Sequence, residues 1–232
     1  MARISHLNIH WIGTYMPTTG LSINSYLILD EYPTLINTGA PVTVKNLIKN
    51  IQSIMDLHNL RYIVLNQSGI AYAGGLEAIL SVSPQARVVT SEHESLNLGL
   101  YGLFIQPLII QQGDKLEIGR NTLQFFSASF IGSPSAIFVY HQPGGILFSG
   151  EAFSITVSEW KPVLEEDVVD LIEAYYDTHI GDSMIARDSI AKLKDLNINL
   201  IAPGHGPMLK NFVGKYVNTL SRTRQAQEYY DA

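Results

Sequence analysis

The sequence predicts a mixed α/β protein of α+β type, in which two β-sheets pack face to face with helices outside, an αββα sandwich. The pattern of elements fits this layering, although periodicity alone does not select it over another α/β fold. Each half of the 232-residue chain begins with short β-rich segments and continues into helical segments with one apolar face. No linker rich in Pro, Gly or Ser separates the halves, so we expect a single domain over residues 1–232.

The first half predicts the order ββαβαβ. Pro41 suits the start of a helix, and apolar residues then recur at helical spacing from Val44 to Met55. The turn at 30–33 joins its two flanking strands into a hairpin. The expected elements are strands 7–12, 24–29, 34–37, 61–65 and 87–90, with helices from Pro41 and over 75–80.

The second half repeats this style. Pro143-Gly144-Gly145 predicts a tight hairpin turn, and His141 beside it is expected at the rim of the sheet. Glu92 and Glu94 are expected near a helix start, where acidic side chains suit the helix dipole. The expected elements are strands 124–128, 136–141, 146–149 and 199–202, with helices over 165–176, 183–196 and 214–230.

Composition excludes several kinds of chemistry. With no cysteine, the chain has no disulfide, thiolate zinc site, iron–sulfur cluster or cysteine nucleophile. A net charge of −6 without a long basic run argues against nucleic acid as a main partner. The most apolar run, 98–110, is interrupted by Gln106 and Pro107, so we expect no membrane span and a cytoplasmic protein.

Five segments, in a fixed order, carry a family resemblance. Residues 24–28 read Asn-Ser-Tyr-Leu-Ile, 35–39 read Leu-Ile-Asn-Thr-Gly, and 62–66 read Tyr-Ile-Val-Leu-Asn. Residues 147–153 read Leu-Phe-Ser-Gly-Glu-Ala-Phe, and 203–207 read Pro-Gly-His-Gly-Pro. This series resembles the metallo-β-lactamase fold superfamily and, within it, the di-iron domain of flavodiiron proteins. The final segment of that family reads Pro-Ser-His-Gly-Pro.

The resemblance implies seven positions that ligate metal in flavodiiron proteins. Glu151, in place of a bridging aspartate, and His205 keep a side chain able to ligate. The other positions are vestigial, because they hold Gln67, Gly69, Ala71, Tyr72 and Gly132.

Two donors are too few for a di-metal centre, which needs several imidazole or carboxylate groups. We therefore expect no cofactor, with iron or zinc bound only if Glu151 and His205 form a residual site. We expect Tyr72 to fill the space of the metals and Glu151 to hydrogen-bond or ion-pair with His205. No residue is assigned a catalytic role.

A metal-free protein of this family is expected to act as a binding, regulatory or assembly partner. The resemblance implies a homodimer or a hetero-oligomer with a related protein. One alternative is a di-iron oxidoreductase for oxygen or nitric oxide, or an oxygen-binding protein, that receives electrons from a partner because no flavodoxin domain is recognised here. The other alternative is a hydrolase with a non-standard metal site.

Overall fold

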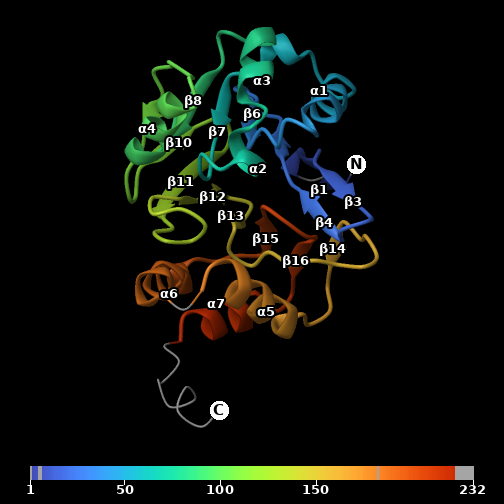
Figure 1. The fold of residues 1–232 in the computed structure, drawn as a ribbon, viewed down its shortest axis with the longest axis vertical. Helices are drawn as coiled ribbons and strands as arrows, with labels where there is room; N and C mark the ends of the chain where they lie inside the picture. The colour runs from blue at the N-terminus through green and yellow to red at the C-terminus, as the bar shows by residue number, and fades with distance from the viewer. Residues whose placement is uncertain (1, 5–6, 182, 223–232) are drawn as a thin grey trace.

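The computed structural model describes residues 2–4, 7–181 and 183–222. Within these residues, two sheets stack face to face and helices cover their outer faces (Figure 1). The predicted αββα sandwich is confirmed. Helices α5, α6 and α7 gather on one outer side, whereas α1 and α3 lie on the opposite side.

The first sheet has the strand order β1-β2-β5-β6-β7-β8-β9. Neighbours from β1 to β6 are antiparallel, and those from β6 to β9 are parallel. The hairpin predicted across 30–33 is therefore confirmed as β5 and β6. The strands are β1 Ala2–Ile4, β2 Ile9–Trp11, β5 Tyr26–Ile28, β6 Thr34–Ile36, β7 Tyr62–Val64, β8 Arg87–Thr90 and β9 Leu108–Ile109.

The second sheet has the order β10-β11-β12-β13-β15-β16-β14, and a separate hairpin pairs β3 with β4. The turn predicted at Pro143-Gly144-Gly145 joins β12 to β13. The strands are β3 Thr14–Met16, β4 Leu21–Ile23, β10 Lys115–Glu117, β11 Thr122–Ser127, β12 Ile137–Gln142, β13 Ile146–Gly150, β14 Val163–Leu164, β15 Leu200–Pro203 and β16 Met208–Lys210.

Helices connect the parallel strands and cover the sheets. Short 3₁₀ helices at Leu57–Asn59 and Lys192–Asp195 extend two of these connections. The α-helices are α1 Val44–Gln52, α2 Ile70–Ala73, α3 Leu76–Val82, α4 Glu92–Leu100, α5 Val169–His179, α6 Met184–Ala191 and α7 Val213–Leu220.

Side-chain alternation along the strands builds the core. On β12, Ile137 and Val139 face the other sheet, while Phe138 and Tyr140 pack in the cluster that includes α5, α6 and α7. Such period-two alternation is what a strand buried on both faces requires. Each sheet therefore supplies one face to the apolar layer between the sheets and its other face to the layer beneath its own helices.

The predicted helix 165–176 begins later than expected. β14 precedes it, and α5 starts only at Val169, whose backbone N–H donates to the Asp167 side chain at 3.2 Å. A carboxylate that accepts from a nearby backbone N–H favours a helix start over a helix interior. Of the helix predicted over 214–230, residues 213–220 form α7, and residues beyond 222 lie outside the described part.

No helix of the described residues is both long and apolar enough to cross a membrane.

The structure corrects the prediction for His141, which is fully buried in β12 and not at a rim. Neither ring nitrogen has a hydrogen-bond partner among the described residues. Burial lowers the pKa of His141 to about 4, although the Asp30 carboxylate acts in the opposite direction. The folded protein therefore holds this imidazole neutral where an unfolded chain would protonate it.

His141 should make folding stability depend on pH. The pKa of His141 is lower in the folded than in the unfolded chain. The free energy of unfolding is therefore at its full value above about pH 6.5, and part of it is lost as the pH falls toward 4. The loss should reach about 3 kcal/mol. The free energy of unfolding, measured with urea at several pH values, should depend less steeply on pH in His141→Leu and His141→Phe than in wild type. The exposed His93→Gln should keep the wild-type slope, and equal slopes in all four proteins would contradict this account.

Candidate functional site

The candidate site lies where strands of both sheets end. β7 leads into Gln67, β13 leads into Glu151, and β15 leads into His205. β13 and β15 are parallel neighbours, so the residues that follow them emerge at the same edge. The carboxyl ends of parallel strands are the usual place for a site in an open α/β sheet.

Asn66 fixes the first of these loops to both sheets. Its backbone N–H donates to Asn37 Oδ1 at 3.0 Å, and Asn37 Nδ2 donates to Asn66 Oδ1 at 2.8 Å. Asn66 Nδ2 in turn donates to the Ile137 carbonyl at 2.7 Å on the second sheet. This buried amide network satisfies backbone groups that the strand ends would otherwise leave unpaired.

Asn24 fixes the last loop in a similar way. Its Nδ2 donates to the carbonyls of Pro203 at 2.8 Å and Gly206 at 2.7 Å. The Trp11 indole donates to Asn24 Oδ1 at 2.8 Å, which holds the amide in this orientation. The segments that carry the family resemblance are therefore the ones that position the loops of the site.

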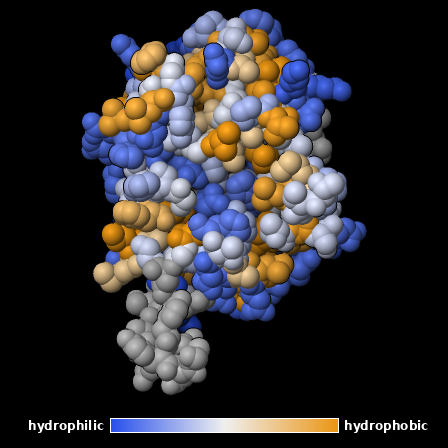
Figure 2. Space-filling view, viewed as in Figure 1, coloured by the Kyte–Doolittle hydropathy of each residue, from blue (hydrophilic) through white to orange (hydrophobic). Residues whose placement is uncertain are grey.

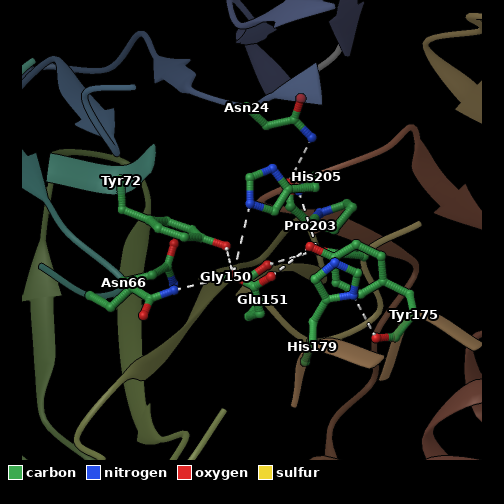
Figure 3. Close-up of polar contacts among 12 residues, drawn as sticks. Asn24, Asn66, Tyr72, Gly150, Glu151, Tyr175, His179, Pro203 and His205 are labelled. Atoms are coloured by element: carbon green, nitrogen blue, oxygen red, sulfur yellow. Dashed lines mark hydrogen bonds and ion pairs between the residues drawn. The ribbon is translucent and has the colours of Figure 1, made fainter. Parts of the chain in front are cut away.

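The Glu151 carboxylate is the centre of the site. Tyr72 donates its hydroxyl to Glu151 Oε2 at 2.7 Å, and Tyr175 donates to Oε1 at 2.6 Å. Figure 3 shows the two phenols approaching the carboxylate from opposite sides, with His205 across its third side. Each oxygen thus accepts a short hydrogen bond, and the side chain of Glu151 is only 13% exposed.

Both phenols are held in the protonated form. Burial raises the pKa of Tyr72 well above 10, and the Glu151 carboxylate raises it further. The same two causes raise the pKa of Tyr175. A phenol must lose its proton to ligate a metal well, so the carboxylate that these hydroxyls bind opposes their use as ligands.

Of the two contacts expected between Glu151 and His205, the structure shows the ion-pair distance and not the hydrogen bond. Its Nδ1 lies 2.6 Å from the Ser22 carbonyl, and because a carbonyl only accepts, Nδ1 carries the proton. Nε2 is the nitrogen that faces Glu151, 3.8 Å from Oε2. This separation is within ion-pair range and too long for a hydrogen bond. The short hydrogen bonds to Glu151 come from Tyr72 and Tyr175.

Tyr72 fills the volume beside the last loop. Its ring makes an edge contact with His205, with 5.7 Å between ring centroids. A Cβ at Gly204 would lie 2.3 Å from the Tyr72 hydroxyl oxygen and 2.7 Å from Cε1. A serine at position 204, as the family segment has it, would therefore collide with the phenol. The absence of a side chain at Gly204 and the presence of one at Tyr72 fit each other.

Gln67 and Gly132 close the other side of the site. Gln67 Nε2 lies 3.4 Å from Glu151 Oε2, a long hydrogen bond. Gly132 has φ +76°, and a Cβ there would lie 2.9 Å from Gln67 Nε2 and 3.0 Å from the Glu151 Cβ. This backbone disfavours a histidine at position 132 for both strain and space. Of the other vestigial positions, Gly69 caps α2 and Ala71 is half-buried on it.

A buried carboxylate outside the ligand positions joins two loops of the site. Glu94 lies in the first turn of α4, as predicted, and is fully buried. Its Oε2 accepts from the Ser68 backbone N–H at 2.6 Å and from the Ser68 hydroxyl at 2.5 Å. Its Oε1 accepts from Ser133 and, at 3.2 Å, from Ser135. Glu94 thus connects the loop after β7 to the loop before β12.

The donor set does not fit a di-metal centre. Among the described residues, no cluster of three or more His, Cys, Asp or Glu side chains is arranged to hold a metal ion. The carboxylate that would bridge two metals instead accepts hydrogen bonds from two protonated phenols. Gln67, Gly69, Ala71 and Gly132 add no charged donor.

Sequence reasoning missed Tyr175 and Glu94. Tyr175 lies within a predicted helix, on the same buried face as Ile172. Its position in the sequence is therefore that of an ordinary core residue. His179, one turn later, stacks on the Tyr175 ring with 3.9 Å between centroids. The serines that hydrogen-bond to Glu94 are separated from it by more than twenty residues, so no local pattern reveals them.

Gly204→Ser should destabilise the protein by about 1–3 kcal/mol, because the new side chain overpacks against Tyr72. In a Tyr72→Ala background the same substitution should cost much less, since the phenol is gone. Urea unfolding of the four proteins gives the coupling energy. Gly214→Ser is the control, because a Cβ at Gly214 meets nothing within 4 Å. An equal cost of Gly204→Ser in both backgrounds would show that the phenol does not occupy this space.

Glu94→Gln should lower the free energy of unfolding by about 1–3 kcal/mol, because an amide nitrogen would then face hydrogen-bond donors. Glu92→Gln, two residues away and exposed, should change it by less than about 0.5 kcal/mol. Thermal or urea unfolding measures both variants. Equal effects of the two substitutions would remove the argument that Glu94 connects the loops.

Known proteins resemble this chain along most of its length. An uncharacterised protein of Methanocaldococcus jannaschii is 28% identical over 90% of the chain and 57% of its own length. A nitric oxide reductase of Moorella thermoacetica is 26% identical over 94% of the chain and 60% of its own length. The chain therefore spans about three-fifths of these curated relatives. The crystal structure of the flavodiiron protein from Giardia intestinalis matches with a TM-score of 0.86 at 22% identity, over 96% of this chain and 59% of that one.

The likeness to the Giardia intestinalis structure shows the fold and, at this identity, only the fold. The family described as ODP family beta lactamase matches residues 21–206, which is most of the chain. This match contains Asn24, Asn66, Glu151 and His205, so it includes the residues that position the site and those at its centre. The chain therefore belongs to the ODP beta-lactamase family and has the metallo-β-lactamase fold of a flavodiiron domain.

Proposed function

We propose that this chain is a metal-free flavodiiron-type domain that acts by binding another protein, as a regulatory or assembly partner. One observation carries the proposal: both oxygens of Glu151 accept hydrogen bonds from phenols, and one phenol comes from a vestigial ligand position. A buried carboxylate needs either a cation or hydrogen-bond donors. Here Tyr72 and Tyr175 supply the donors, so the fold no longer needs a metal at this position.

The alternatives require donors that this site does not offer. A di-iron oxidoreductase or an oxygen-binding protein needs several histidines and carboxylates around the metals. A metal-dependent hydrolase needs a metal-bound water, and a residual site of Glu151 and His205 would compete with the hydrogen bonds of Tyr72 and Tyr175. The protein partner is proposed to be a second copy of this chain or an intact flavodiiron protein.

Protein from cells grown with added iron, and separately with added zinc, should contain far less than one metal ion per chain. Elemental analysis after desalting measures this content. Glu151→Gln is the matched variant, because a true site would lose its metal in this protein and adventitious uptake would not change. One or two equivalents of iron or zinc in wild type, lost in Glu151→Gln, would refute the metal-free proposal.

Light scattering of the chain, alone and mixed with an intact flavodiiron protein, tests for assembly. A monomer that binds neither partner would refute the assembly role.

A further inference from the structure

An apolar groove lies on the outer side of the loop that carries the vestigial ligand positions. Its volume is about 380 Å³. Three parts of the chain border it: the segment just before α1, helix α2, and the segment just after α4. Its volume is within the range of binding pockets. The lining residues are Pro41, Ser68, Ile70, Ala73, Gly74, Glu77, Tyr101 and Leu103.

Large apolar side chains continue beyond the groove. Ile70 is 71% exposed and Tyr101 63% exposed, and both line the groove. Leu100, Phe104 and Val42, next to lining residues in the sequence, are 84%, 91% and 80% exposed. Figure 2 shows hydrophobic surface over the regions where Figure 1 places α2 and α4. An apolar surface wider than its pocket is typical of protein recognition and unlike a site for a small molecule alone.

One charge is placed beside this apolar surface. Glu77 lines the groove, is exposed, and has no ion pair with any cation of the described residues. An acidic group at the rim of an apolar groove favours a partner that places a cation next to an apolar anchor. Ser68, the other polar residue of the lining, is already bound to Glu94.

We propose that this groove binds a protein segment that presents an apolar or aromatic side chain flanked by lysine or arginine. The apolar side chain lies against Ile70 and Tyr101, and the cation pairs with Glu77. This inference rests on the proposed binding function and identifies the surface and the partner chemistry. α2 connects the groove to the site, because Ile70 lines the groove while Tyr72 donates to Glu151 from the same helix.

Fluorescence anisotropy with labelled peptides tests the proposal on the wild-type chain. The probes are Lys-Leu-Ser-Phe-Lys, its charge-reversed form Glu-Leu-Ser-Phe-Glu, and Lys-Ser-Ser-Ser-Lys without apolar anchors. Wild type should bind the first peptide about tenfold more tightly than either of the others. Glu77→Lys should reverse the preference between the first two peptides, and Ile70→Ser should weaken binding of both.

Matched controls lie elsewhere on the surface. Glu159→Lys and Ile185→Ser change exposed residues of the same types and should bind as wild type does. Equal affinity for all three peptides, or equal effects of the control variants, would overturn the proposal. Displacement of the first peptide by phenethylamine at similar concentrations would identify a small-molecule site and also overturn it. If the protein contains metal and still prefers the first peptide, the metal-free proposal is refuted and the proposal of a peptide-binding groove is supported.

Discussion

The structure of the site depends on how one buried carboxylate is satisfied. Glu151 follows β13 at the edge where both sheets end, and a carboxylate there is costly unless cations or hydrogen-bond donors surround it. Tyr72 and Tyr175 donate one short hydrogen bond to each of its oxygens. These two bonds connect α2, on the first sheet, to α5, on the helical layer of the second sheet.

The packing around the carboxylate fits these two hydrogen bonds. The phenol of Tyr72 occupies the space that a side chain at position 204 would need, and Gly204 leaves that space free. Gly132, in a left-handed conformation, brings its backbone close to Gln67 and Glu151. Glu94 and the serines that it binds connect the loop after β7 to the loop before β12. The loops are therefore held by hydrogen bonds and packing, with the buried asparagines fixing the strand ends.

The fold could be predicted from the sequence, whereas the contacts of the candidate site could not. Alternation along strands such as β12 indicates a buried sheet, and the ordered motif segments at Asn24 and Asn66 select the αββα sandwich among α/β folds. Tyr175 and Glu94 act through partners far away in the sequence, which no periodicity encodes. His141 illustrates the same limit, because its position beside a turn suggested exposure and only the packing of the second sheet buries it.

The central claim of the proposed function is that hydrogen bonds from Tyr72 and Tyr175 satisfy Glu151 without a metal. The most direct measurement is anomalous X-ray scattering at the iron and zinc edges, from crystals of protein produced with both metals in the medium. The account predicts no anomalous peak between Glu151 and His205, and a Tyr72 hydroxyl within hydrogen-bond distance of the carboxylate. A peak at that position, with Tyr72 displaced from Glu151, would contradict it.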